Sequence, residues 1–335
     1  NSDAVKFQKR TVSRILTKEG LDAPYNSIHS FGKSYGEHKN FMEFNFDQFR
    51  ELKEYADQKG IMFTASGWDE QSVDFLDDLG VPFFKMASAD LTNLNLMLHT
   101  ARKGKPMIIS TGMSDLKTVI EVYNEISKIN DKIAILQCTS TYPSEPDEVN
   151  LNVIKTYQQV FPNAVIGFSS HDRGIQISTS AVTLGAKIVE KHFTFDRTAK
   201  GNDHACSLEK PGLERLIRDI RIIEQAMGDF VKEVQESEKP CFKKLAKSIV
   251  SEIAIPAGTV ITREHLTTKG PRPDNAICPM RINELIGKCA LVDIPEDVVI
   301  MENTIDWDYI GKELEEDGSD TDIDQYASIP NAEEI

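Results

Sequence analysis

The chain has 335 residues, of which 40% are hydrophobic, and a formal net charge of −15 at pH 7. This length predicts one large globular domain with a smaller one beside it in the sequence. The acidic balance argues against a nucleic-acid partner. No apolar run reaches the roughly 18 residues of a membrane-spanning helix, and no signal-peptide pattern opens the chain, so we expect a cytoplasmic protein without a membrane partner.

The negative charge is concentrated at the end of the chain. Between Glu313 and Ile335 there are nine acidic residues and no Lys or Arg, and taking these nine charges from −15 leaves −6 on residues 1–312. We expect residues 311–335 to form an acidic disordered tail. The rest of the chain is only mildly acidic, which leaves room for a local basic pocket. The five scattered cysteines lack CxxC spacing and are expected to be reduced thiols.

Short apolar runs rich in β-branched and aromatic residues alternate with segments of helical periodicity over the first 230 residues or so. This alternation predicts βα units and a parallel sheet. We expect seven strands at 4–7, 61–65, 81–86, 106–109, 133–136, 165–168 and 187–193, and helices that include 46–59, 69–79, 114–129, 174–184 and 211–227.

Seven strands are one short of a closed (β/α)8 TIM barrel. Because the chain starts almost inside a strand, we infer that it lacks the first βα unit of such a barrel. An open doubly wound sheet is the alternative that the pattern leaves.

The composition changes after the last predicted helix. Residues 232–246 are polar and read as a linker, and residues 247–310 contain strand-like pieces and turn signals but no long helical pattern. The expected organisation is therefore a barrel domain over 1–231, a linker over 232–246, a small turn-rich domain over 247–310 and the acidic tail.

Polar residues follow each predicted strand. In parallel barrels the loops after the strands converge on one mouth, where functional side chains gather. Lysines and short hydroxyl side chains at such ends suit phosphate or carboxylate oxygens. The endings are Lys6 and Gln8; Thr64 and Ser66; Lys85 and Ser88; Ser110 and Thr111; Gln137, Thr139, Ser140 and Tyr142; Ser169, Ser170 and His171; and Glu190 with His192.

Two of these endings, on neighbouring strands, carry the histidines His171 and His192. Neutral imidazoles there can converge on one divalent metal and leave positions open for water or substrate. Without a third protein ligand we expect a weak, exchangeable site that suits Mn²⁺ or Mg²⁺ better than structural zinc. Each histidine alone could instead be a general acid or an ordinary hydrogen-bonded side chain. The polar loop 200–209 could cover the mouth, or its Asp203 or Ser207 could cap the next helix.

At these residues the sequence resembles the sialic acid synthases, which condense phosphoenolpyruvate with an N-acylated amino sugar. The matching stretches occur in family order: KFQ at 6–8, KMAS at 85–88, STGM at 110–113, QCTSTYP at 137–143, GFSSH at 167–171, EKH at 190–192 and the loop 201–209. Beyond them, KSIV at 247–250, IPAGT at 255–259 and IGK at 286–288 resemble the antifreeze-like (SAF) domain of the same family.

The resemblance implies a transferase with an assigned site. It implies catalytic roles for His171, His192 and Glu190, with the metal on the two histidines. Arg272 would reach the sugar from the antifreeze-like domain of a second subunit, which implies a domain-swapped homodimer. Phosphoenolpyruvate would meet Lys6, Lys85, Ser88, Ser110, Ser140 and Ser169, and the sugar would meet Gln8, Ser66, Asp90, Tyr142, Glu190 and Asp203.

Residues 10–45 resemble the animal-type enzymes, which act on N-acetylmannosamine 6-phosphate. Candidates to meet the extra phosphate are Lys9, Arg10, Lys33, His38 and Lys39, although charged residues in a loop are often merely solvated.

The chain departs from the bacterial members of the family at three positions: Asp90 replaces a usual Glu, Ser140 a common Asn and Gln137 a frequent His. Family members also carry a Glu near the sugar on the first strand, which would precede this chain. We therefore expect the chain alone to be poorly folded or inactive.

Three alternatives to this function remain open. The acceptor could be unphosphorylated N-acetylmannosamine. The chain could be a barrel aldolase with a Schiff-base lysine, or another synthase that condenses phosphoenolpyruvate. It could also be a non-catalytic sugar-binding or ice-binding relative.

Overall fold

A computed structural model describes residues 2–310, which form two compact units that divide between Asp229 and Phe230. The predicted acidic tail, 311–335, lies outside the described residues. No helix in the described part of the chain is long and apolar enough to cross a membrane.

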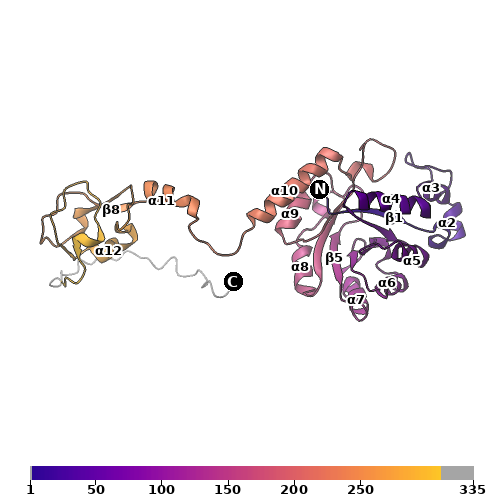
Figure 1. The fold of residues 1–335 in the computed structure, drawn as a ribbon, viewed down its shortest axis with the longest axis horizontal. Helices are drawn as coiled ribbons and strands as arrows, with labels where there is room; N and C mark the ends of the chain where they lie inside the picture. The colour runs from indigo at the N-terminus through magenta and orange to yellow at the C-terminus, as the bar shows by residue number, and fades with distance from the viewer. Residues whose placement is uncertain (1, 311–335) are drawn as a thin grey trace. The chain divides into compact units, whose positions relative to one another are not determined.

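The first unit is built on one parallel sheet of seven strands in the order β1-β2-β3-β4-β5-β6-β7. The sheet curls, with helices on its outer side (Figure 1). A doubly wound sheet would reverse its strand order at a switch point, and this sheet does not. The predicted barrel-type fold is therefore confirmed, with strands β1 (Ala4–Lys9), β2 (Met62–Gly67), β3 (Phe84–Met86), β4 (Met107–Ser110), β5 (Ile133–Cys138), β6 (Val165–Ser170) and β7 (Val189–Lys191).

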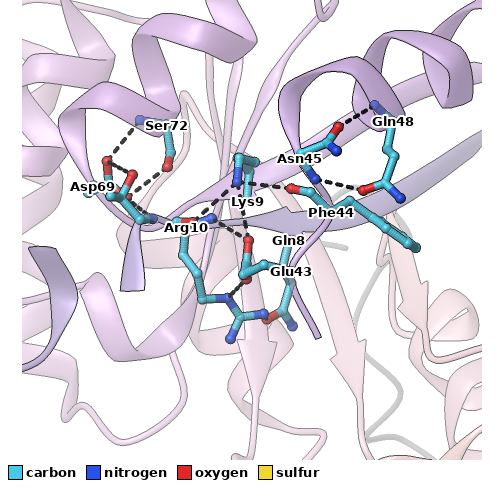
Figure 2. Close-up of polar contacts among 10 residues, drawn as sticks. Gln8, Lys9, Arg10, Glu43, Phe44, Asn45, Gln48, Asp69 and Ser72 are labelled. Atoms are coloured by element: carbon cyan, nitrogen blue, oxygen red, sulfur yellow. Dashed lines mark hydrogen bonds and ion pairs between the residues drawn. The ribbon is translucent and has the colours of Figure 1, made fainter. Parts of the chain in front are cut away.

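Helices follow the strands as the periodicity predicts, and side-chain caps mark where several of them begin. Asn45 and Gln48 form a reciprocal capping box at the start of α4, and Asp69 caps α5 by accepting from the backbone of Ser72 (Figure 2). Such caps satisfy backbone N–H groups that the first turn leaves free. The helices are α4 (Phe46–Gln58), α5 (Glu70–Asp78), α6 (Leu94–Ala101), α7 (Leu116–Ser127), α8 (Val153–Val160), α9 (Gln176–Thr183) and α10 (Lys210–Ala226).

An extra segment lies between β1 and α4. It contains the short helices α1 (Val12–Ile15), α2 (Lys18–Asp22) and α3 (Tyr35–Phe41). Its centre is an aromatic cluster in which the buried His38 ring lies 4.6 Å from the Tyr25 ring and 5.8 Å from the Phe31 ring. This packing gives the segment a small apolar centre of its own.

The core of the first unit lies between the sheet and its helices. Phe49, Phe63, Phe84, Phe161 and Phe168 are fully buried there. Full burial of one such side chain stabilises the fold by roughly 1.5–3 kcal/mol, so this core holds the strand ends in fixed positions.

The second unit is small and turn-rich, as predicted. Its strands pair antiparallel, β8 (Ser248–Ser251) with β9 (Leu266–Lys269) and β10 (Cys289–Ala290) with β11 (Ile305–Asp306). Its core is rich in isoleucine, including Ile249, Ile261 and Ile300. The segment predicted as a linker contains the helix α11 (Lys239–Leu245), and a further helix of this unit is α12 (Ile282–Leu285).

Candidate active site

A cavity of about 220 Å³ lies where the strands of the sheet end. Within the first unit, every residue that the resemblance assigned to catalysis, phosphoenolpyruvate or the sugar lines this cavity except Asp90. Residues far apart in the sequence, from Lys6 on β1 to His192 just after β7, thus come together as predicted.

Some polar strand endings do not line the cavity. Thr111 and Gln137 are next in sequence to cavity residues, and successive side chains of a strand point to opposite faces. Their side chains donate hydrogen bonds of 2.9 Å to the backbone carbonyls of Leu136 and Val149. These two residues therefore fasten neighbouring segments together.

Lys6, Lys85 and Glu190 form one end of the cavity, called its floor below, where both lysine amines approach the one carboxylate. Lys6 Nζ lies 3.3 Å from Glu190 Oε1, and the buried Lys85 Nζ lies 3.6 Å from Glu190 Oε2. Lys85 also donates to Ser110 Oγ at 2.7 Å and to the carbonyl of Met86 at 2.8 Å. Burial alone would raise the pKa of Glu190, but the two lysines outweigh it and hold this pKa at about 2. Glu190 is therefore ionised at neutral pH, with both lysine amines beside its carboxylate.

The two histidines face each other across the cavity. Their ring centres lie 5.3 Å apart and the ring planes meet at 71°. His171 Nδ1 lies 2.6 Å from the carbonyl oxygen of Thr139, so Nδ1 carries a proton. Burial alone would lower the pKa of His171, but the Cys138 thiol, the Thr139 carbonyl and Glu190 raise it. Burial lowers the pKa of His192 to about 4, although Asp203, 3.6 Å from its Nδ1, acts in the opposite direction.

This histidine pair fits a divalent metal as a two-nitrogen donor set. His192 is neutral at pH 7, as a metal ligand must be, so its ring could donate a nitrogen lone pair to an ion held together with His171. Within residues 2–310 no group of three or more His, Cys, Asp or Glu side chains is arranged to hold a metal. Water or substrate would have to supply the remaining ligands.

Cys138 is a site residue that the sequence reasoning passed over. Its thiol lines the cavity, 3.8 Å from His171 Nδ1 and 3.5 Å from Ser88 Oγ. Burial would raise the pKa of this thiol, but His171, Ser88 and Lys85 lower it to about 7. Its position could have indicated this role: Cys138 ends β5 two residues before Ser140, and alternate residues of an extended chain share a face.

Gly112 is required by close packing in the cavity wall. Its backbone N–H donates to Ser88 Oγ at 3.0 Å, and a Cβ atom on it would lie only 2.1 Å from Ser140 Oγ. The glycine of the STGM stretch thus lets two predicted phosphoenolpyruvate ligands approach the same backbone.

Two loops meet beside the cavity. The backbone N–H of Gly201 donates to His29 Nδ1 at 3.1 Å, and Asn202 Nδ2 donates to the hydroxyl of Tyr25 at 3.3 Å. The 10–45 segment is thereby joined to the loop that carries the cavity residue Asp203.

Asp90 and Arg272 are the remaining assigned residues. Asp90 ends a short 3-10 turn and is buried; its Oδ1 accepts from Asn93 Nδ2 at 3.3 Å, and burial raises its pKa. Arg272 belongs to the second unit, where its guanidinium lies 5.2 Å from the centre of the Phe242 ring.

Comparison with known proteins gives consistent matches over both units. The NeuB family model matches residues 1–232 and the SAF domain model matches residues 246–306. N-acetylneuraminate-9-phosphate synthase of Homo sapiens is 47% identical and covers 91% of this chain and 85% of its own length. The protein of the same name from Drosophila melanogaster is 36% identical, covering 90% of this chain and 87% of its own length. A crystal structure of the sialic acid synthetase of Leptospira borgpetersenii in complex with citrate is 30% identical, has a TM-score of 0.62 and covers 71% of this chain and 79% of its own.

Proposed function

The chain belongs to the NeuB family, and from this premise we propose that it condenses phosphoenolpyruvate with N-acetylmannosamine 6-phosphate to N-acetylneuraminate 9-phosphate and phosphate. The human and fly relatives are N-acetylneuraminate-9-phosphate synthases by name, which supports the phosphorylated product. The observation that carries the proposal is the pair Lys6 and Lys85 around Glu190, in a cavity that the strand ends share. We place the reaction in the cytoplasm.

Phosphoenolpyruvate is proposed to bind over the two lysines. Its carboxylate and phosphate need fixed positive charge and hydrogen-bond donors, and charge-assisted contacts of this kind are the strong ones. Lys6 and Lys85 supply the charge. Hydroxyl donors line the same cavity at Ser88, Ser110, Ser140 and Ser169.

The sugar is proposed to lie across the histidines, with its hydroxyls near Gln8, Ser66, Tyr142 and Asp203. Support comes from Ser66 Oγ, a buried polar atom without a hydrogen-bond partner among residues 2–310, because such an atom is expensive to leave unpaired. When bound there, Mn²⁺ or Mg²⁺ would be held by His171 and His192 and would act as a Lewis acid on the aldehyde of the open-chain sugar.

In the proposed reaction C3 of phosphoenolpyruvate forms a bond to the aldehyde carbon, whose oxygen takes up a proton. Water then adds to C2, and the bond from C2 to the phosphate ester oxygen breaks, which leaves the keto acid and inorganic phosphate. Lys6 and Lys85 would stabilise negative charge on this tetrahedral centre. The Tyr142 ring, 4.2 Å from that of His171, would limit access of bulk water.

A domain-swapped homodimer is part of the proposal, with Arg272 of one subunit reaching the sugar in the other. Mixing Arg272→Ala and His171→Ala variants tests it, because a mixed dimer would contain one site with both wild-type residues. We expect partial recovery of activity on mixing; no recovery in a verified mixed dimer would refute the swap.

The direct test of the function is release of inorganic phosphate from phosphoenolpyruvate with N-acetylmannosamine 6-phosphate or N-acetylmannosamine, each with and without Mn²⁺. We expect release that needs both sugar and metal and is faster with the phosphorylated sugar. A reaction without sugar controls for simple hydrolysis. Absence of sugar-dependent release with both sugars, from a version that also carries a first βα unit, would refute the proposal.

A barrel aldolase is the second candidate, favoured by one observation. Lys85 is buried and its pKa is lowered by that burial, against the opposing effect of Glu190, as in a lysine that forms Schiff bases. Borohydride in the presence of a keto acid would trap such a lysine covalently. The synthase should give no adduct.

A further inference from the structure

The five cations that the sequence offers for a second phosphate have different surroundings. All three donors of the Lys9 amine have partners within the protein. Its Nζ donates to the carbonyls of Arg10 and Phe44, both at 3.2 Å, and to Glu43 Oε2 at 3.3 Å (Figure 2). His38 is buried, and its Nδ1 accepts the backbone N–H of Phe31 at 3.2 Å. Lys9 therefore has no donor to spare for a ligand, and neither Lys9 nor His38 lines the cavity.

The remaining cations, Lys33, Arg10 and Lys39, differ in whether they line the cavity. Lys33 is exposed and does not line the cavity, whereas Arg10 and Lys39 do. Burial lowers the pKa of His38, and Lys39, Arg10 and Lys200 lower it further. Lys39 and Arg10 thus line the cavity and both lie close enough to His38 to lower its pKa.

Two contacts orient the Arg10 guanidinium but leave some of its N–H donors without a partner within residues 2–310. Its Nε lies 2.5 Å from Glu43 Oε1, and its Nη2 donates to Gln8 Oε1 at 2.6 Å. Figure 2 shows the guanidinium between these two side chains. Nη1, with two N–H donors, has no partner among residues 2–310. The Arg10 guanidinium is therefore oriented, with donors free for an anion.

The surroundings leave positive charge and unpaired donors at this end of the cavity. Glu43 offsets only one of the charges of Lys9, Arg10 and Lys39. Lys39 Nζ lies 5.1 Å from the Tyr35 ring and makes no ion pair in the described chain. The ring of Trp68 lies 5.4 Å from Arg10 Cζ, and its buried Nε1 has no partner within residues 2–310.

The positions of Lys6, Gln8 and Arg10 along the chain show how far Arg10 lies from the floor of the cavity. Lys6, Gln8 and Arg10 occupy alternate positions and all line the cavity. At about 3.3 Å per residue, Lys6 and Arg10 are separated by about 13 Å of extended backbone. A ligand in the cavity would thus meet the floor lysines, then Gln8, then Arg10.

We infer that Arg10 and Lys39 form a second anion subsite that takes the phosphate monoester of the sugar, with Glu43 and Gln8 positioning Arg10. The inference rests on the proposed function and adds which side chains would select the phosphorylated acceptor.

The test compares Arg10→Gln, Lys39→Gln and the control Lys33→Gln in the full chain. We expect the preference in kcat/KM for N-acetylmannosamine 6-phosphate over N-acetylmannosamine to fall about tenfold or more in the first two variants, as loss of a charged hydrogen bond would produce. Lys33→Gln should keep the wild-type preference, and Arg10→Lys should recover part of it. Retained preference in both Arg10→Gln and Lys39→Gln would overturn the inference.

Calorimetry separates this inference from the proposed function, because it needs no turnover. The ligands are the two sugars and inorganic phosphate. Tighter binding of the phosphorylated sugar, lost in Arg10→Gln and Lys39→Gln, supports the subsite even if no phosphate is released. Equal binding of both sugars to the wild type, or inorganic phosphate binding as tightly as the sugar phosphate, would overturn it.

Discussion

Glu190→Gln removes the carboxylate that Lys6 and Lys85 share, at 3.3 and 3.6 Å. The side chain is only 18% exposed, so water screens these pairs weakly. Its pKa lies at about 2 in the folded chain against an ordinary value of 4.5. A difference of about 2.5 units at 1.36 kcal/mol each predicts that the ionised carboxylate stabilises the fold by about 3 kcal/mol at pH 7.

Urea unfolding of wild type and Glu190→Gln at pH 7 measures this difference in the free energy of unfolding. The matched control is Glu224→Gln, which removes an exposed ion pair with Arg221 of 2.9 Å and should change stability by about 1 kcal/mol or less. Because the folded pKa is depressed, the contribution of Glu190 is fully present above pH 4.5 and declines as pH falls toward 2. A Glu190→Gln variant as stable as its control at pH 7 would refute the reasoning.

Three further predictions follow from particular contacts. Lys191→Met leaves Asp172 buried without its cationic partner, since both side chains are 2% exposed. We expect the free energy of unfolding, measured with urea, to fall by about 3–5 kcal/mol and to be partly recovered by adding Asp172→Asn. A double variant no more stable than the single one would contradict this. Gly112→Ala places Cβ against Ser140 Oγ, so we expect the KM for phosphoenolpyruvate to rise roughly tenfold or more; an unchanged KM would show that the wall can relax. Chelation of divalent metal with EDTA should abolish condensation and added Mn²⁺ should restore it, whereas full activity after chelation would remove the metal from the proposal.

The sequence predicted the strand ends well because the pattern is local. Apolar runs fixed each strand, and the parallel arrangement then brought Lys6 and His192 to one cavity although they are remote in sequence. Cys138 was missed for a related reason: it was treated as a reduced thiol by count and spacing, while its proximity to His171 depends on which face of β5 it occupies.

The sequence could not predict which cations of the 10–45 segment line the cavity. Lys9 and Arg10 are adjacent and of the same charge, yet Lys9 gives its three donors to Glu43 and to backbone carbonyls while Arg10 lines the cavity. That division depends on where Glu43 lies after an irregular loop, which no periodicity encodes. Likewise Asp90, two residues after Ser88, turns away from the cavity wall at the end of a 3-10 turn.

Mass spectrometry of the products formed in H₂¹⁸O tests the proposed condensation most directly. With phosphoenolpyruvate, N-acetylmannosamine 6-phosphate and Mn²⁺, we predict N-acetylneuraminate 9-phosphate and inorganic phosphate in equal amounts, with no ¹⁸O in the phosphate because water adds to C2. Pyruvate with labelled phosphate and no nine-carbon product would contradict it.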